Sequence, residues 1–85
     1  SVSGDILLKL DPLHMDSVTT RLVGYSEISY IYRSTGEYDA VAVIYAHDMN
    51  HFNSLVKEIK MLEGVKDVRV SVTTEFIKSN PTFVL

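Results

Sequence analysis

The chain has 85 residues, of which 46% are hydrophobic and 22% charged, and this length and composition fit a single folded domain and exclude a disordered chain. Its net charge of −3, with scattered Lys and Arg residues, excludes the basic stripe with which nucleic-acid-binding proteins neutralise phosphates. The chain has no cysteine, and its longest apolar run, residues 40–46, is far shorter than the roughly 20 residues of a membrane span, so we expect a cytoplasmic protein without disulfides.

The first part of the chain predicts a strand followed by a helix. Residues 5–10 form a short apolar run that Asp11 and Pro12 close, which is typical of a buried strand before a loop. Over residues 14–23 the apolar side chains recur at three- and four-residue spacing, so we expect an amphipathic helix that Gly24 ends.

Two further strands follow and are predicted to form a hairpin. Residues 28–34 and 38–45 are rich in β-branched and aromatic side chains, which favour strands. Residues 35–37, with the sequence Thr-Gly-Glu, suit a tight turn between them.

The last third of the chain predicts a second helix, a strand and a tail. Asp48 is a suitable N-cap for the helix and Gly64 is placed to end it. Residues 65–76 are rich in Val and Thr and predict the fourth strand, and residues 77–85 form a tail whose last three residues, 83–85, could pair at a sheet edge. The helix carries the clearest apolar stripe of the sequence, made of Met49, Phe52, Leu55, Val56, Ile59 and Leu62.

The order βαββαβ predicts an α+β, ferredoxin-like sandwich in which a four-stranded antiparallel sheet carries two helices on one face, as a single domain over residues 1–85.

The face of this sheet that carries no helices would be polar if it met water. Both alternating sets of side chains in residues 40–45 are apolar instead, so we expect a homodimer through the sheet faces, although a missing domain or the tail could cover the same surface. The expected interface side chains are Leu7, Val41, Val43 and Tyr45.

Residues suited to catalysis or to metal binding are sparse. His47 and His51 lie four residues apart with Asp48 between them, but no third ligand has suitable spacing, so we expect solvated histidines and no metal or cofactor. The acidic residues fall mostly at turns and helix ends, and no triad, carboxylate pair or Gly-rich phosphate loop is present, which predicts a protein that is not an enzyme. Residues 36–41 are comparable with an RNA-recognition strand motif, but its basic residue and second aromatic are absent.

Three segments together resemble the C-terminal effector-binding and oligomerisation module of the Lrp/AsnC family of prokaryotic regulators. The segments are residues 34–39 (Ser-Thr-Gly-Glu-Tyr-Asp), residues 47–49 (His-Asp-Met) at the start of an amphipathic helix, and residues 62–69 (Leu-Glu-Gly-Val-Lys-Asp-Val-Arg) at the start of a strand. The similarity continues through Glu75 and residues 78–80, so it spans nearly the whole chain.

The resemblance implies a module that dimerises through its sheets, often assembles further into octamers, and binds an amino acid where dimers meet. A turn with a carboxylate and free backbone N–H groups would suit the ammonium and carboxylate of such a ligand. Gly36 could instead serve only a turn that needs positive φ, and Asp39 only a hydrogen bond within the turn. By matching position, the expected effector contacts are Gly36, Tyr38 and Asp39, with His47, Asp48, Val68 and Val70 beside them.

Two departures from the family limit what the resemblance implies. Val68 and Val70 stand where family members often have threonine, so the effector could differ, bind weakly or be absent. The usual helix-turn-helix is missing from this sequence, so the chain would be a stand-alone module or part of a longer regulator, and would act on transcription through a DNA-binding partner or a missing domain.

Three other functions stay open from the sequence. The chain could be an ACT-like regulatory domain of a metabolic enzyme, a small dimeric α/β-barrel enzyme of isomerase or monooxygenase type, or an assembly module without a ligand. A pocket between the sheet and the helices would favour the enzyme, whereas a pocket shared between dimers would favour the sensor.

Overall fold

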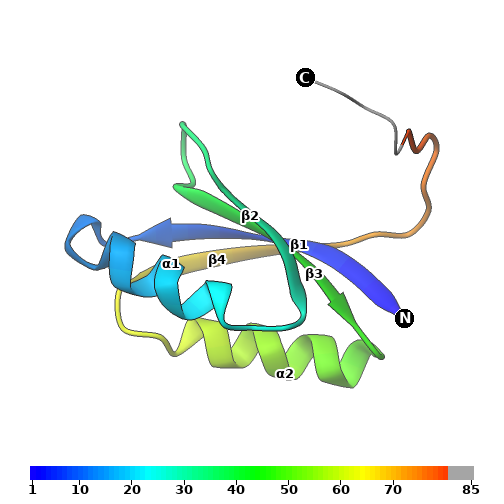
Figure 1. The fold of residues 1–85 in the computed structure, drawn as a ribbon, viewed down its shortest axis with the longest axis horizontal. Helices are drawn as coiled ribbons and strands as arrows, with labels where there is room; N and C mark the ends of the chain where they lie inside the picture. The colour runs from blue at the N-terminus through cyan, green and yellow to red at the C-terminus, as the bar shows by residue number, and fades with distance from the viewer. Residues whose placement is uncertain (81–85) are drawn as a thin grey trace.

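The computed structural model describes residues 1–80, and Figure 1 shows the course of the chain. The elements, in chain order, are strand β1 (Val2–Leu10), the short 3-10 helix η1 (Pro12–His14), helix α1 (Met15–Val23), strands β2 (Ile28–Arg33) and β3 (Ala40–Ala46), helix α2 (Met49–Lys60) and strand β4 (Val65–Val72).

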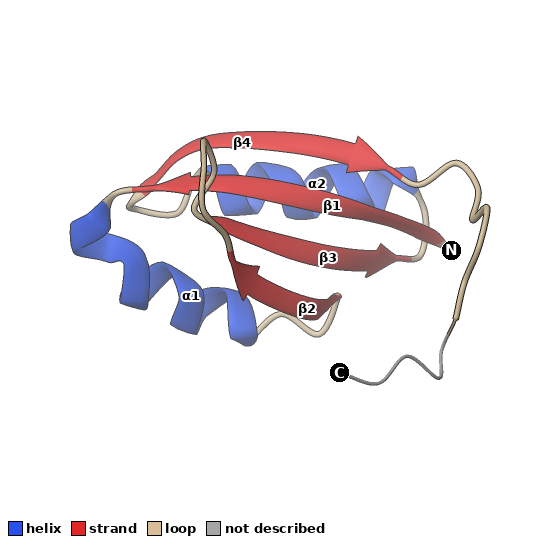
Figure 2. Ribbon diagram, turned by 90° about the horizontal axis from the view of Figure 1, so that it is seen from above, coloured by secondary structure: helices blue, strands red, loops and turns tan. Residues whose placement is uncertain are grey.

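The strands form one antiparallel sheet in the order β2-β3-β1-β4, with β1 and β3 in the interior. Both helices lie on the same side of this sheet in Figure 1, and Figure 2 looks onto the other side, with the strands in front of α2. The predicted ferredoxin-like arrangement is therefore confirmed. Paired residues share a face of the sheet, and in the register of β1 the residues opposite Ile6 are Ala42 on β3 and Val70 on β4.

The core fills the space between the sheet and the two helices. Alternate residues of β1 point into it, because a strand turns successive side chains to opposite faces. The helices supply the other half through one stripe each, which confirms the apolar periodicity seen in the sequence. The largest fully buried side chains are Phe52, Ile6, Leu8, Leu22, Ile44, Ile59 and Val18.

Two helix ends follow the local signals in the sequence. The Asp48 side chain accepts a hydrogen bond of 2.8 Å from the backbone N–H of His51, which makes it the N-cap of α2. Gly64 follows α2 with φ of +96°, a conformation that residues with a side chain rarely adopt, and a Cβ atom there would collide with His14. The backbone at Gly64 also accepts a hydrogen bond of 2.8 Å from the N–H of Asp11, which joins the start of β4 to the end of β1.

Three strand boundaries differ from the sequence prediction by two residues or more. β1 begins at Val2 and not at residue 5, because residues 2–4 pair with the end of β3. β3 begins at Ala40 and not at residue 38, and β4 ends at Val72 and not at residue 76. Residues 77–80 form no strand, and the predicted edge pairing of residues 83–85 lies outside the described residues.

The face without helices, which we call the open face, differs from the prediction that both faces are apolar. Its β2 and β3 half is apolar and aromatic, whereas its β1 and β4 half is mostly polar and charged, because the alternation in those strands sets their apolar residues on the helix side. The side chains of the open face are Ser3, Asp5, Leu7, Lys9, Tyr30, Tyr32, Val41, Val43, Tyr45, Asp67, Arg69 and Ser71.

The burial of Phe52 yields a first prediction. Phe52→Ala removes a fully buried ring that occupies the space a Cβ atom at Gly4 would need, so we expect the free energy of unfolding to fall by about 3–5 kcal/mol. Met61→Ala, at an 84% exposed position, is the control and is expected to change it by less than about 0.5 kcal/mol. Urea denaturation followed by circular dichroism measures both, and equal losses would contradict the assignment of the core.

Candidate functional site

The loop that joins β2 to β3, residues 34–39, closes on itself through two hydrogen bonds. The N–H of Ser34 donates to the carbonyl oxygen of Asp39 at 3.0 Å, and the Ser34 hydroxyl donates to the carbonyl oxygen of Tyr38 at 3.0 Å. Gly36 at its tip has φ of +100°, and a Cβ atom there would meet no neighbour within 4 Å. Gly36 is therefore required by the backbone conformation and not by lack of space.

Asp39 anchors this loop to the central strand. Its N–H donates to the carbonyl oxygen of Leu8 at 2.8 Å, and its carboxylate oxygen Oδ2 accepts from the N–H of Leu10 at 2.8 Å. The half-buried carboxylate thus has a structural contact with the end of β1, which differs from the hydrogen bond within the turn that the sequence left as an alternative. Its role toward an effector stays a prediction.

Tyr38 links the loop to β4 across the open face. The Tyr38 hydroxyl donates to Oδ2 of Asp67 at 3.2 Å, and the Arg69 guanidinium carbon lies 5.6 Å from the centre of the Tyr38 ring, within the range of a cation–π contact. Burial is the main cause that raises the pKa of Tyr38 above its ordinary value of 10.0, so the hydroxyl stays protonated and can donate at neutral pH.

Asp67 and Arg69 were not among the residues expected from the sequence. They alternate with Val68 and Val70 along β4, and this alternation was the signal that they share a face. The register shows which face, since Asp67 lies opposite Lys9 and Arg69 lies opposite Leu7 on the open side. We call residues 34–39 together with Asp67 and Arg69 the loop cluster.

Val68 and Val70 lie on the other side of the sheet from Asp67 and Arg69. They pair with Leu8 and Ile6, whose side chains are in the core, and Val68 packs against that core. Their side chains therefore lie on the helix side of the sheet, because a strand residue cannot present its side chain to both faces, and their contact with an effector stays a prediction.

His47 and Asp48 lie at the opposite end of β3 from the loop cluster. The strand between them spans about 23 Å at roughly 3.3 Å per residue, so one chain does not bring the two predicted groups together. Asp48 caps α2, and the His47 ring stacks on the His51 ring with centroids 5.2 Å apart. Both residues therefore have local structural contacts at the start of α2.

His51 joins the start of α2 to the residue before β2. Its Nδ1 accepts from the N–H of His47 at 3.1 Å, so its Nε2 carries the proton and donates to Oε2 of Glu27 at 2.8 Å. This hydrogen bond is the main cause that lowers the pKa of Glu27 below its ordinary value of 4.5. An open hollow of about 440 Å³ lies beside the pair, lined by Ser1, Ser26, Glu27, Tyr45, Ala46, His47 and His51.

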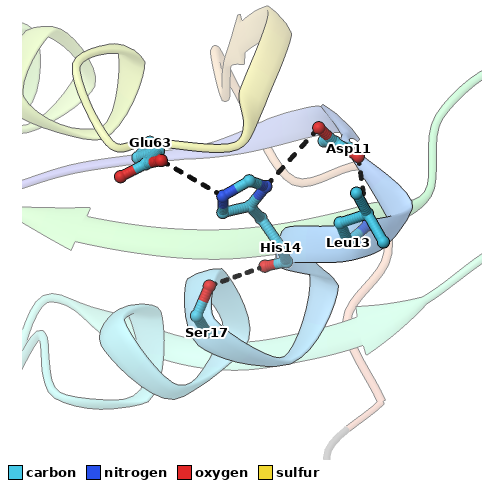
Figure 3. A network of polar contacts seen from close by, with 5 residues as sticks. All are labelled: Asp11, Leu13, His14, Ser17 and Glu63. Carbon is cyan, nitrogen blue, oxygen red and sulfur yellow. Dashed lines mark hydrogen bonds and ion pairs between the residues drawn. The ribbon is translucent and has the colours of Figure 1, made fainter.

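Another histidine, His14, joins the end of β1 to the loop after α2 (Figure 3). His14 lies between two carboxylates, with Nε2 3.2 Å from Oε1 of Glu63 and Nδ1 3.4 Å from Oδ2 of Asp11. The pKa of Asp11 is lowered chiefly by the hydrogen bond from the N–H of Leu13, with His14 as a further cause. A hollow of about 570 Å³ opens beside this histidine between α1 and the loop after α2.

Neither metal binding nor a membrane span finds support in residues 1–80. Within this range no group of three His, Cys, Asp or Glu side chains is arranged to hold a metal ion. No helix there is long and apolar enough to cross a bilayer.

Comparison of the sequence with known proteins shows the family that this chain resembles. The family model described as the Lrp/AsnC ligand binding domain matches residues 6–83. An HTH-type transcriptional regulator of Pyrococcus furiosus, FL11, is 29% identical over 73 residues, which cover 86% of this chain and 48% of the regulator. The chain thus spans about half the length of that relative.

Two solved structures show the same fold. A transcriptional regulator of Neisseria meningitidis, in complex with L-methionine, superposes with a TM-score of 0.90 at 20% identity, over 99% of this chain and 56% of its own. A Thermus thermophilus protein superposes with a TM-score of 0.86 at 19% identity, over 93% of this chain and 100% of its own. At these identities the likeness concerns the fold.

The Glu27–His51 pair yields a prediction on pH. A carboxyl group with a lowered folded pKa stabilises the native state above its unfolded pKa of about 4.5, and this contribution is lost as the pH falls through the folded value. We expect Glu27→Gln to lower the free energy of unfolding at neutral pH, by about 1 kcal/mol or less for this partly exposed pair. Urea denaturation of both proteins at neutral pH and at about pH 3 measures the difference, which should shrink in acid. A constant difference would refute the charged contact.

Proposed function

This chain belongs to the Lrp/AsnC ligand-binding domain family, and from that membership we propose that it senses an amino acid or a related small metabolite at contacts between copies of itself. It would act in the cytoplasm, without catalysing a reaction, on transcription or amino-acid metabolism. The DNA contact would come from a partner of Lrp type or from another part of a longer protein, since the matched relative is an HTH-type regulator about twice as long as the matched part.

The loop cluster is the observation that carries this proposal. It brings the carboxylates of Asp39 and Asp67, the guanidinium of Arg69 and the backbone of Gly36 to one end of the open face. A free amino acid carries an ammonium and a carboxylate, and carboxylates and a guanidinium are the groups that form charge-assisted hydrogen bonds with them. L-Methionine in the neisserial structure shows that a protein of this fold can hold such a ligand.

The proposed contact set differs from the sequence expectation in two ways. Asp67 and Arg69 replace Val68 and Val70, because the valines lie on the helix side of the sheet. His47 and Asp48 lie at the far end of β3, so we propose that they would reach a ligand at the loop cluster only from a neighbouring copy.

Dimerisation through the open face is supported by its composition. Exposed Tyr30, Tyr32 and Tyr45 make its β2 and β3 half a broad aromatic surface, and Leu7 and Val43 are half-buried among them. Aromatic side chains of this kind are enriched at protein interfaces. Val41, also expected there, is already buried within the subunit and would add little new area.

The charged half of the open face also suits a second copy. It carries two acidic residues, Asp5 and Asp67, and two basic ones, Lys9 and Arg69, so this half is neutral overall. Two identical copies can therefore face each other without net repulsion, and further assembly, up to the octamer expected from the family resemblance, would use other surfaces.

The alternative of a small barrel enzyme has less support. Such an enzyme needs a pocket between the sheet and the helices, and that space is occupied by fully buried Phe52, Ile44 and Ile59. The family match also favours a sensor over an ACT-like domain.

A ligand screen tests the sensing function. We expect one or a few of the twenty amino acids to raise the melting temperature in a thermal-shift assay, because a ligand at 100 times its dissociation constant stabilises the native state by roughly 2.7 kcal/mol. Asp39→Asn can keep an oxygen for the Leu10 N–H while removing the charge, and is expected to lose this shift. Glu37→Gln, on the same loop, is the control for loss of a negative charge. No shift with any amino acid would contradict amino-acid sensing.

A lysine on the open face tests the dimer. Val43 lies between Asp5 on β1 and Tyr30 on β2, so the side chain in Val43→Lys can remain solvated beside Asp5 in a folded monomer. In the dimer this lysine and Asp5 would have to be buried among aromatic side chains, and the desolvation cost opposes association. We expect sedimentation equilibrium to show a dimer for the parent and a monomer for this variant, with unchanged circular dichroism. Met61→Lys on the helix side should remain a dimer. A dimeric Val43→Lys would show that another surface forms the contact.

A further inference from the structure

The chain continues after β4 as an extended segment that leaves the body of the domain. We call residues 73–79 the C-terminal arm, and it contains no helix or strand. A hydrogen bond of 2.8 Å from the N–H of Thr73 to the carbonyl oxygen of Ser3 holds its base beside the start of β1. Figure 1 shows the arm, in orange to red, turning toward the side of the sheet opposite the helices.

The arm does not cover the open face of its own subunit. Seen from above in Figure 2, it passes beyond the ends of the strands and leaves the strands themselves uncovered. Residues 73–80 therefore do not provide the cover that the sequence left as one alternative, and this part of the chain leaves the apolar half of the open face exposed.

Two adjacent apolar side chains in the arm are left in solvent. Phe76 is 69% exposed and Ile77 is 94% exposed, and they are flanked by Glu75 and Lys78. Single exposed apolar residues are common on soluble proteins, but these two stand on a segment that projects from the fold. A partner that buried them would have to lie on the side toward which the arm turns.

We propose that the arm of each subunit packs, through Phe76 and Ile77, against a second copy seated on the open face. This inference rests on the proposed dimer, because the arm projects toward the side on which that second copy would lie. Two-fold symmetry makes the contact reciprocal, so two arms hold each dimer.

Charge and area favour a second copy as the occupant. The arm carries one acidic and one basic residue, Glu75 and Lys78, and the charges of the open face also balance, so neither surface selects a strongly charged partner. A phenylalanine buries about 150–250 Å² when it is covered, so two reciprocal arms would add a large share of a stable interface of about 1,600 Å².

The absence of cysteine from the chain makes a site-specific test possible. Ile77→Cys carries a polarity-sensitive fluorophore, and Leu13→Cys, at a 91% exposed position in η1, carries the same label as the control. Both labelled variants are made in the parent protein and in the Val43→Lys variant, which provides the monomeric reference. We expect the emission at position 77 to shift to the blue only in the parent, and the emission at position 13 to be the same in both backgrounds.

A second variant measures the energetic contribution. The double substitution Phe76→Ser and Ile77→Ser is expected to raise the dimer dissociation constant by at least about tenfold, whereas Leu13→Ser leaves it unchanged. A parent dimer with the same emission at position 77 in both backgrounds, and with an unchanged dissociation constant in the double variant, would overturn the arm contact and leave the proposed dimer intact. A parent that is monomeric at every concentration would overturn both.

Discussion

The pairing of β1 with strands on both of its sides is the interaction on which the rest of the molecule depends. Its alternation sends Ile6, Leu8 and Leu10 into the core and leaves Asp5, Leu7 and Lys9 on the open face. Its backbone also forms hydrogen bonds with the candidate site and the arm. The carbonyl oxygen of Leu8 and the N–H of Leu10 bond to Asp39, and the carbonyl oxygen of Ser3 accepts from the N–H of Thr73 at the base of the C-terminal arm. One strand thus positions the core, the candidate site and the arm together.

This arrangement explains how a small domain can hold the loop cluster in one conformation while its open face associates with other copies. The loop cluster is fixed by backbone hydrogen bonds and by Tyr38, so the charged groups that would meet an effector are placed before any ligand arrives. The open face beside it would be buried by a second copy, so a ligand at its edge could favour one assembly over another through its different affinity for the two states.

Two histidines, each in contact with a glutamate, join separate parts of the fold. His14 joins the end of β1 to the loop after α2, and His51 joins the start of α2 to the residue before β2. Their carboxylate partners, Glu63 and Glu27, are distant in the sequence, so the sequence indicated solvated histidines and could not show the contact between His51 and Glu27.

Local patterns in the sequence determined the element order, the two helices, the Asp48 cap and the turn at Gly36, and the resemblance of three segments identified the family. Periodicity, capping and positive φ depend on neighbouring residues, so they are readable without coordinates. The tertiary structure alone decided that Asp67 and Arg69, and not Val68 and Val70, share a face with Tyr38. It also decided that the Asp39 carboxylate accepts a hydrogen bond from the N–H of Leu10. Both depend on the register between strands about 30 residues apart, where a shift by one residue reverses every side chain.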